Sequence, residues 1–213
     1  MTIDSALLIT TFVTLFVVID PLALAPLFLA LTRGKPARVR RAIAVRASLT
    51  AIGVLTVFGA FGEAVLNFAG ISMPAFRVAG GLLLFLTALE MLFERRTKRR
   101  EHQAEGADDD DGQDDHDPSV FPLAIPLIAG PGAIASMILL AGQNPGPEGL
   151  AVVVAVMVVV VTLSMVSFMV SDLMERVLGK TGINVITRLL GMLLAALAVQ
   201  FVLDGLRDFG FAG

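Results

Sequence analysis

The chain has 213 residues, of which 56% are hydrophobic and 16% charged, and its mean hydropathy is +0.83. Soluble domains carry about 25% charged residues, so this composition excludes an ordinary soluble protein. The net charge is −3, and the absence of cysteine excludes disulfides, thiolate metal sites and cysteine nucleophiles.

Six apolar segments are each long enough to cross a hydrocarbon core about 30 Å thick as a helix. They comprise residues 6–31, 42–63, 73–92, 120–140, 149–170 and 185–206. None alternates apolar and polar residues at a period of two, as the strands of a membrane β-barrel do. The residues before the first segment include Asp4 and no Lys or Arg, which argues against a cleaved signal peptide. We therefore predict an all-α membrane protein with six transmembrane helices.

The first segment is interrupted at Asp20-Pro21, within the stretch IDPLALAPLFLALT at 19–32. Proline lacks an N–H and clashes with the carbonyl one turn earlier, so a helix should end here and a new half-helix should begin. Asp20 is suited to cap the new half-helix, although a carboxylate near the bilayer centre costs about 2.5–3.5 kcal/mol. Three further roles remain open for it: receiving a substrate ammonium, binding a coupling proton or cation, or pairing with Arg77 or Arg188.

The basic residues alternate between loops in a way that predicts the orientation. With six spans, 13 of the 16 Lys and Arg residues lie in or beside the loops that follow the first, third and fifth spans, including five between residues 95 and 100. Such basic loops face the cytoplasm under the positive-inside rule. We therefore expect a plasma-membrane protein with cytoplasmic basic loops and both termini outside.

The third loop, residues 95–119, changes from basic to acidic and has seven aspartates between 108 and 117. Its spacing does not fit an EF-hand, because alignment of Gly112 with the turn glycine puts Ala107 at the first ligand position. His102 and His116 are too far apart to indicate a metal site. We interpret the loop as a disordered cytoplasmic linker between a first half, 1–94, and a second half, 120–213.

The second half repeats the pattern of the first with an offset of about 110 residues. Gly130-Pro131-Gly132, within PLAIPLIAGPGAIASMIL at 122–139, falls opposite Asp20-Pro21, and Arg188 falls opposite Arg77. Each half has an odd number of spans, so the halves should enter the membrane in opposite senses. We predict two inverted three-helix repeats with broken first and fourth helices, an arrangement that places a substrate near the bilayer midplane in secondary transporters.

The two breaks indicate where a ligand would bind. The half-helices that begin at Pro21 and Pro131 would turn free N–H groups and positive dipole ends toward one point, which suits an anion such as a carboxylate. The predicted substrate-binding residues are Asp20, Pro21, Leu22, Ala23, Gly130, Pro131, Gly132, Ala133, Arg77 and Arg188. Alternatively, the breaks only kink the helices for packing, and the arginines extend to the headgroups or hold carbonyls freed by a break. We expect no metal site and no cofactor.

Four stretches in this order, IDPLALAPLFLALT, FRVAGGLLLFLTALEML, PLAIPLIAGPGAIASMIL and RLLGMLLAALAVQFVLDGL, together resemble the MarC family of inner-membrane proteins. This family includes the SnatA-type small neutral amino-acid transporters, while other members have no assigned substrate and an early link to antibiotic resistance gave the family its name. The resemblance implies six spans in the plasma membrane. It also places the family's Asn/Asp-Pro and Gly-Pro-Gly motifs at Asp20-Pro21 and Gly130-Pro131-Gly132, and its helix-start arginines at Arg77 and Arg188.

We predict a secondary transporter that moves small neutral amino acids, such as glycine or alanine, by alternating access. Its partners would be the amino acid, the lipid bilayer and a coupling proton or sodium ion, with no nucleic acid. An exporter or channel for other small solutes, including drugs, and a non-transporting membrane protein are the alternatives. Apart from Asp20, the spans have no central His, Cys or Glu for catalysis, so we do not expect an enzyme. No GxxxxGK[ST] motif for nucleotide binding is present.

Overall fold

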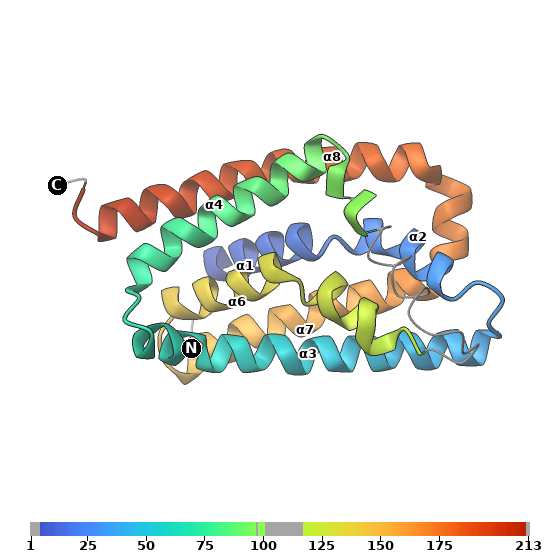
Figure 1. Ribbon diagram of the computed structural model, residues 1–213, viewed down its shortest axis with the longest axis horizontal. Helices are drawn as coiled ribbons and strands as arrows, with labels where there is room; N and C mark the ends of the chain where they lie inside the picture. Colours follow the sequence, from blue (N-terminus) through green and yellow to red (C-terminus); the bar gives the residue numbers. More distant parts are fainter. Residues whose placement is uncertain (1–4, 97, 101–116, 212–213) are drawn as a thin grey trace.

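The computed structural model describes residues 5–96, 98–100 and 117–211, and this part of the chain is helical, without strands. Figure 1 shows the helices side by side along the long axis of the molecule. They are α1 (Ser5–Ile19), α2 (Pro21–Leu31), α3 (Ala37–Phe68), α4 (Met73–Leu92), η1 (Ser119–Ile128), α6 (Pro131–Gln143), α7 (Pro147–Met169) and α8 (Ser171–Asp208). The predicted all-α class is confirmed.

Five of the described helical segments are long and apolar enough to cross a membrane, and the bent pair η1 and α6 makes up to six. This agrees with the predicted number of spans. The bounds of α4 coincide with the predicted segment 73–92, while α3 extends beyond the predicted 42–63 at both ends. Helix α8 is interrupted at Gly179, whose φ of 59° lies in the left-handed region that glycine adopts without steric cost, so its spanning part follows that residue.

The two broken spans lie between two pairs of helices. Helix α4 packs along α8 on one side, and α3 contacts α7 on the other (Figure 1). Helices α1 and α2 pack against α7, whereas η1 and α6 pack against α3, and α1 also contacts α6. The broken spans therefore form the centre of the bundle.

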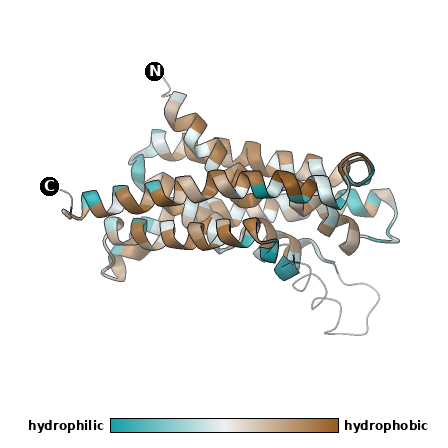
Figure 2. Ribbon diagram, turned by 90° about the horizontal axis from the view of Figure 1, so that it is seen from above, coloured by the Kyte–Doolittle hydropathy of each residue, from teal (hydrophilic) through white to brown (hydrophobic). Residues whose placement is uncertain are grey.

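The outer surface of the bundle is apolar. Figure 2 shows hydrophobic residues along most of the length of the helices, and large side chains such as Leu49, Phe61, Leu86 and Leu203 are exposed. A soluble protein rarely exposes a contiguous apolar surface of this extent. Together with the length of the helices, it indicates a lipid-facing exterior.

Both ends of the described chain lie at the same end of the bundle (Figure 1). The loop between α2 and α3, the residues that follow α4 and the start of η1 lie at the opposite end (Figure 1). We call it the basic end because that loop contains Arg33 and Lys35 and the residues after α4 include Arg95, Arg96, Lys98, Arg99 and Arg100. Residues 101–116, which include most of the predicted acidic linker and both histidines, lie outside the described residues.

The first span is interrupted where the sequence predicts. Helix α1 ends at Ile19, Asp20 adopts a left-handed backbone with φ 57° and ψ 68°, and α2 begins at Pro21. Aspartate and asparagine tolerate this conformation better than most residues with a Cβ. The Asp-Pro pair thus supplies both the turn and the start of the next helix.

The fourth span is irregular over a longer stretch than the predicted break at 130–132. Within η1, Phe121 and Ile125 have extended backbone angles, and each precedes a proline. The residue before proline is sterically driven toward such angles. Helix α6 then begins at Pro131, bent by 57° from η1. Pro122 and Pro126, in addition to Pro131, therefore account for the shape of this span.

Candidate functional site

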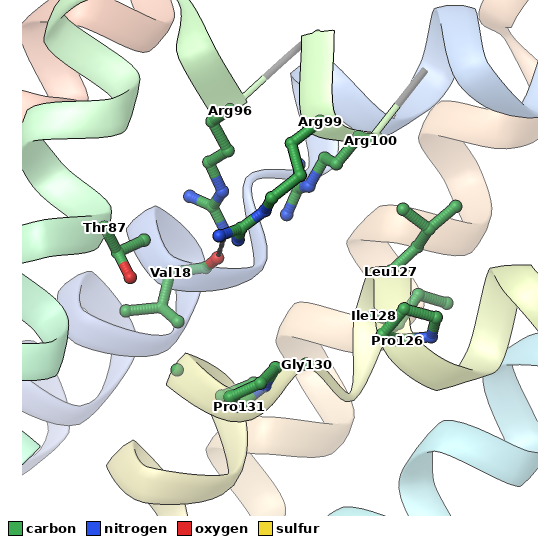
Figure 3. A pocket seen from close by; sticks show the side chains of 12 residues that line it. Val18, Thr87, Arg96, Arg99, Arg100, Pro126, Leu127, Ile128, Gly130 and Pro131 are labelled. Carbon is green, nitrogen blue, oxygen red and sulfur yellow. Dashed lines mark hydrogen bonds between the residues drawn. The ribbon is translucent and has the colours of Figure 1, made fainter. Parts of the chain in front are cut away.

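A cavity of about 200 Å³ lies between the end of α1 and the start of α6 (Figure 3). Its lining comes from α1, α4, the residues after α4, and the fourth span. The lining residues are Val18, Thr87, Arg96, Arg99, Arg100, Pro126, Leu127, Ile128, Gly130, Pro131, Gly132 and Ala133. Four of the ten predicted site residues, at positions 130–133, are among them.

The start of α6 forms one wall of this cavity. Gly130 is the N-cap residue and provides no side-chain hydrogen bond to the helix, and Pro131 occupies the first helical position. The first amides of a helix have no acceptor within the helix, so those of Gly132 and Ala133 are available to a ligand. The start of α6 therefore lines the cavity, and anion binding there stays a prediction.

The two glycines beside Pro131 have different roles. A Cβ added to Gly130 would lie 2.6 Å from the carbonyl oxygen of Pro126, so glycine is required there by the approach of the chain's own backbone. A Cβ on Gly132 would lie 3.2 Å from Cγ1 of Val18 and 3.8 Å from Oγ1 of Thr87. Gly132 therefore faces two residues that line the cavity.

The opposite wall contains two buried arginines that the sequence analysis assigned to a disordered linker. Arg96 and Arg100 are only 6% and 5% exposed. Arg96 donates a hydrogen bond to the carbonyl of Val18, and Nη2 of Arg100 lies 3.1 Å from the carbonyl oxygen of Ile19. These carbonyls belong to the last turn of α1, where intrahelical partners are missing. The first residues of the expected linker are thus folded into the bundle.

Burial also affects the pKa of these two groups. It lowers the pKa of the Arg96 guanidinium, which the nearby Asp20 carboxylate partly offsets. It lowers the pKa of Arg100 more strongly, and the positive charge of Arg96 adds to that effect. Both side chains remain protonated, because arginine does not lose its proton in proteins. The two charges are therefore held in a poorly solvated place.

Asp20 lies beside the cavity rather than in its lining. It is fully buried, and its Oδ1 accepts a hydrogen bond of 3.3 Å from the backbone N–H of Ala23. Its Oδ2 accepts one of 3.4 Å from the hydroxyl of Thr187. The predicted cap of α2 is confirmed. The two half-helix starts do not line the same cavity, and the start of α2 is occupied by the Asp20 carboxylate.

The remaining residues predicted beside Asp20 lie away from the cavity. Pro21 is the buried first residue of α2, Leu22 is half-buried, and neither lines the cavity. Ala23 lines a separate cavity of about 170 Å³. The other residues that line this second cavity are Pro26, Glu94, Lys98, Lys180, Ile183 and Asn184.

Of the three roles left open for Asp20, pairing with Arg77 or Arg188 is not the one found in the described residues. Arg77 forms an ion pair with Asp208, and Arg188 forms one of 2.7 Å with Glu94. Both arginines lie on the α4–α8 pair, whose helix ends bring these carboxylates closer than the central Asp20. They also do not hold the carbonyls freed by the break in the first span, which Arg96 and Arg100 bind instead.

Comparison with known proteins agrees with the architecture. A family model described as "MarC family integral membrane protein" matches residues 5–209. The chain belongs to the MarC family. It is 37% identical over 204 residues to a UPF0056 membrane protein of Aquifex aeolicus, covering 95% of this chain and 93% of that protein. It is 34% identical over 200 residues to the UPF0056 inner membrane protein YhgN of Escherichia coli, covering 94% and 96%.

A third relative, the UPF0056 membrane protein MJ1677 of Methanocaldococcus jannaschii, is 32% identical over 206 residues, covering 96% of this chain and 98% of that protein. No solved structure matches this chain. The chain is thus an integral membrane protein of the MarC family over nearly its whole length, and the names of these relatives state no transported substrate.

In this MarC protein, sequence reasoning missed Arg96 and Arg100. The signal that was present is their spacing: residues four apart lie on the same face of a helix. Counting all five basic residues between 95 and 100 as loop charges hid this face. The exposed residues Arg95, Lys98 and Arg99 fit the loop interpretation, and the two buried ones do not.

Proposed function

We propose that this MarC-family protein is a secondary transporter that moves small neutral amino acids across the plasma membrane by alternating access. The observation that carries the proposal is the position of the cavity, which lies between the last turn of α1, beside the break in the first span, and the start of α6. Interrupted helices in the two halves of a membrane protein are the best structural indication of a transported substrate's site.

The size of the cavity favours a small substrate. Sites for drug-sized ligands occupy about 300–1,000 Å³, and this cavity has about 200 Å³. A helix start with free amides and three arginines suits a carboxylate, which every amino acid carries. An exporter of larger drugs would need a roomier site than this one.

We further propose that the halves 1–94 and 120–213 are inverted repeats that move against each other. The packing is consistent with two halves of equivalent arrangement, because each broken span packs against the second span of the other half. Helices α1 and α2 pack on α7, and η1 and α6 pack on α3. The ion pairs Arg77–Asp208 and Arg188–Glu94 also each join an arginine of one helix in the α4–α8 pair to the end of the other.

The proposed orientation places the basic end in the cytoplasm and both termini outside. The loops with most of the Lys and Arg residues lie at that end, as the positive-inside rule requires. The sequence has no GxxxxGK[ST] motif through which this chain would use a nucleotide, and we propose a proton or sodium ion as the coupling ion.

Flux into proteoliposomes that contain the purified full chain tests the transport proposal. We expect uptake of labelled glycine or alanine above that of empty liposomes, driven by a proton or a sodium gradient. The exposed variant Glu148→Gln, at the start of α7, is the control and should transport like the unaltered protein. Absence of flux under every gradient, with protein correctly inserted, would contradict the proposal.

A further inference from the structure

The buried charges beside the cavity do not balance within the described part of the chain. Arg96 and Arg100 are buried cations, and Asp20 is the buried carboxylate near them. Arg99 is a more exposed cation, and it is matched by Glu90 at 2.7 Å. Two buried positive charges thus face one buried negative charge. An uncompensated buried charge is costly unless a counter-charge or water solvates it.

Arg100 places part of this excess positive charge at the cavity. Its Nη2 donates to the carbonyl of Ile19, whereas its Nη1 is buried and has no hydrogen-bond partner among the described residues. Arg100 lines the cavity. Figure 3 shows the guanidinium groups of Arg96, Arg99 and Arg100 together on one side of the cavity, with Gly130 and Pro131 on the other. Nη2 of Arg100 therefore holds the end of α1, while Nη1, unpartnered within the described part of the chain, is placed to bind a ligand.

The facing wall has the same preference for an anion. Helix α6 has 13 residues, begins in the cavity lining and has no side-chain cap. Its amides and its dipole both favour a negative group at this end. In contrast, the start of α2 is already occupied by the Asp20 carboxylate. Among the described residues, the start of α2 thus has a carboxylate and the start of α6 has no side-chain cap.

We infer that this cavity binds one carboxylate group between Nη1 of Arg100 and the amides at the start of α6. The inference deepens the proposed function, on which it rests for the choice of an amino acid as the natural ligand. The carboxylate recognised belongs either to a zwitterionic amino acid or to a free monocarboxylate. Because Arg100 also holds the end of α1, a bound carboxylate joins the broken spans of the two halves.

Equilibrium binding to the purified full chain tests this without relying on transport. Titration calorimetry in chloride-free buffer would compare three probes of similar size: alanine, propionate, which lacks the ammonium, and alaninamide, which lacks the carboxylate. We expect binding of alanine, propionate or both, and at least tenfold weaker binding of alaninamide. Alaninamide binding as tightly as alanine and propionate, or no binding by either carboxylate, would overturn the inference on the unaltered protein alone.

Variants then locate the site. Arg100→Gln should weaken the binding of the carboxylate probes about tenfold or more, because a charge-assisted hydrogen bond is lost. Arg207→Gln removes the same charge from an exposed position at the far end of α8 and should change the affinity less than twofold. Equal effects of the two variants would overturn the assignment to Arg100.

The two proposals fail in different ways. Binding of propionate but not alanine, lost in Arg100→Gln, supports the carboxylate site and contradicts amino-acid transport. Amino-acid flux that is as fast in Arg100→Gln as in the unaltered protein, with alanine binding also unchanged, contradicts the carboxylate site and leaves transport standing.

Discussion

Nη2 of Arg100 lies 3.1 Å from the carbonyl oxygen of Ile19, a residue 81 positions earlier in the chain. Ile19 is the last residue of α1, and Arg96 binds the carbonyl of the residue before it. A helix that ends inside a membrane protein must have its last carbonyls satisfied by protein or water. The segment after the third span therefore completes the broken end of the first.

Replacement of Arg96 tests this structural role. Arg96→Gln should lower the free energy of unfolding by about 1–3 kcal/mol, because the carbonyl of Val18 stays buried without its charged donor. Thermal unfolding followed by circular dichroism in detergent would measure the change. Lys98→Gln, an exposed residue two positions away, is the matched control. Equal midpoints for the two variants would show that the Arg96 contact does not contribute to stability.

The two glycines at the start of α6 should respond differently to a methyl group. Gly130→Ala should destabilise the protein by about 1–3 kcal/mol, because its Cβ meets the backbone oxygen of Pro126 at 2.6 Å. Gly132→Ala meets the Val18 side chain at 3.2 Å, which can shift, so its stability should change less while its Cβ narrows the cavity. The free energy of unfolding and the amino-acid flux, measured on both variants, would test these two expectations. The reverse order of stabilities would contradict the described approach to Pro126.

Asp20 both caps α2 and carries a buried negative charge. The variant Asp20→Asn tests the two roles separately, because it can keep the cap but removes the charge. Asparagine keeps an oxygen that can accept from Ala23 N–H, so the variant should insert and fold. It removes the buried carboxylate that faces Arg96 and Arg100, so flux should fall about tenfold or more. Uptake in proteoliposomes, normalised to inserted protein, is the measurement. Flux equal to that of the unaltered protein would reduce Asp20 to a cap.

Asp117 should make a pH-dependent contribution to the stability of the fold at the basic end. Burial alone would raise the pKa of this carboxyl, but hydrogen bonding to Ser119 and the charge of Arg46 leave it below the ordinary value of 3.8. A carboxyl with a lowered folded-state pKa stabilises the fold above its unfolded-state pKa. This contribution is lost as the pH falls from about that ordinary value through the lower folded-state pKa.

The unaltered protein should therefore unfold at a higher temperature than Asp117→Asn at pH 7, and the two should converge as the pH falls below about 3.8. The effect should be small because the Arg46–Asp117 pair is largely exposed to solvent. Thermal unfolding of both proteins across this pH range would test the sign. A difference that grows on acidification would contradict it.

Much of the fold follows from local sequence. The number of spans follows from hydropathy, and the bounds of α4 match the predicted segment. The breaks at Asp20 and before Pro131 were predictable because a proline's missing N–H and its steric clash act on the preceding turn, whatever surrounds the helix. The cap by Asp20 is equally local, since its partner is three residues away.

The composition of the site was decided by tertiary packing. Which carboxylate each of Arg77 and Arg188 meets, and which carbonyls Arg96 and Arg100 reach, depends on helices separated by 78 to 131 residues of chain. The local sequence around a basic residue near a span is the same whether its side chain faces the headgroups or packs inside the bundle. Only the packed helices determine which buried polar groups need a partner, and so the sequence alone predicted the breaks but not the arginines that complete them.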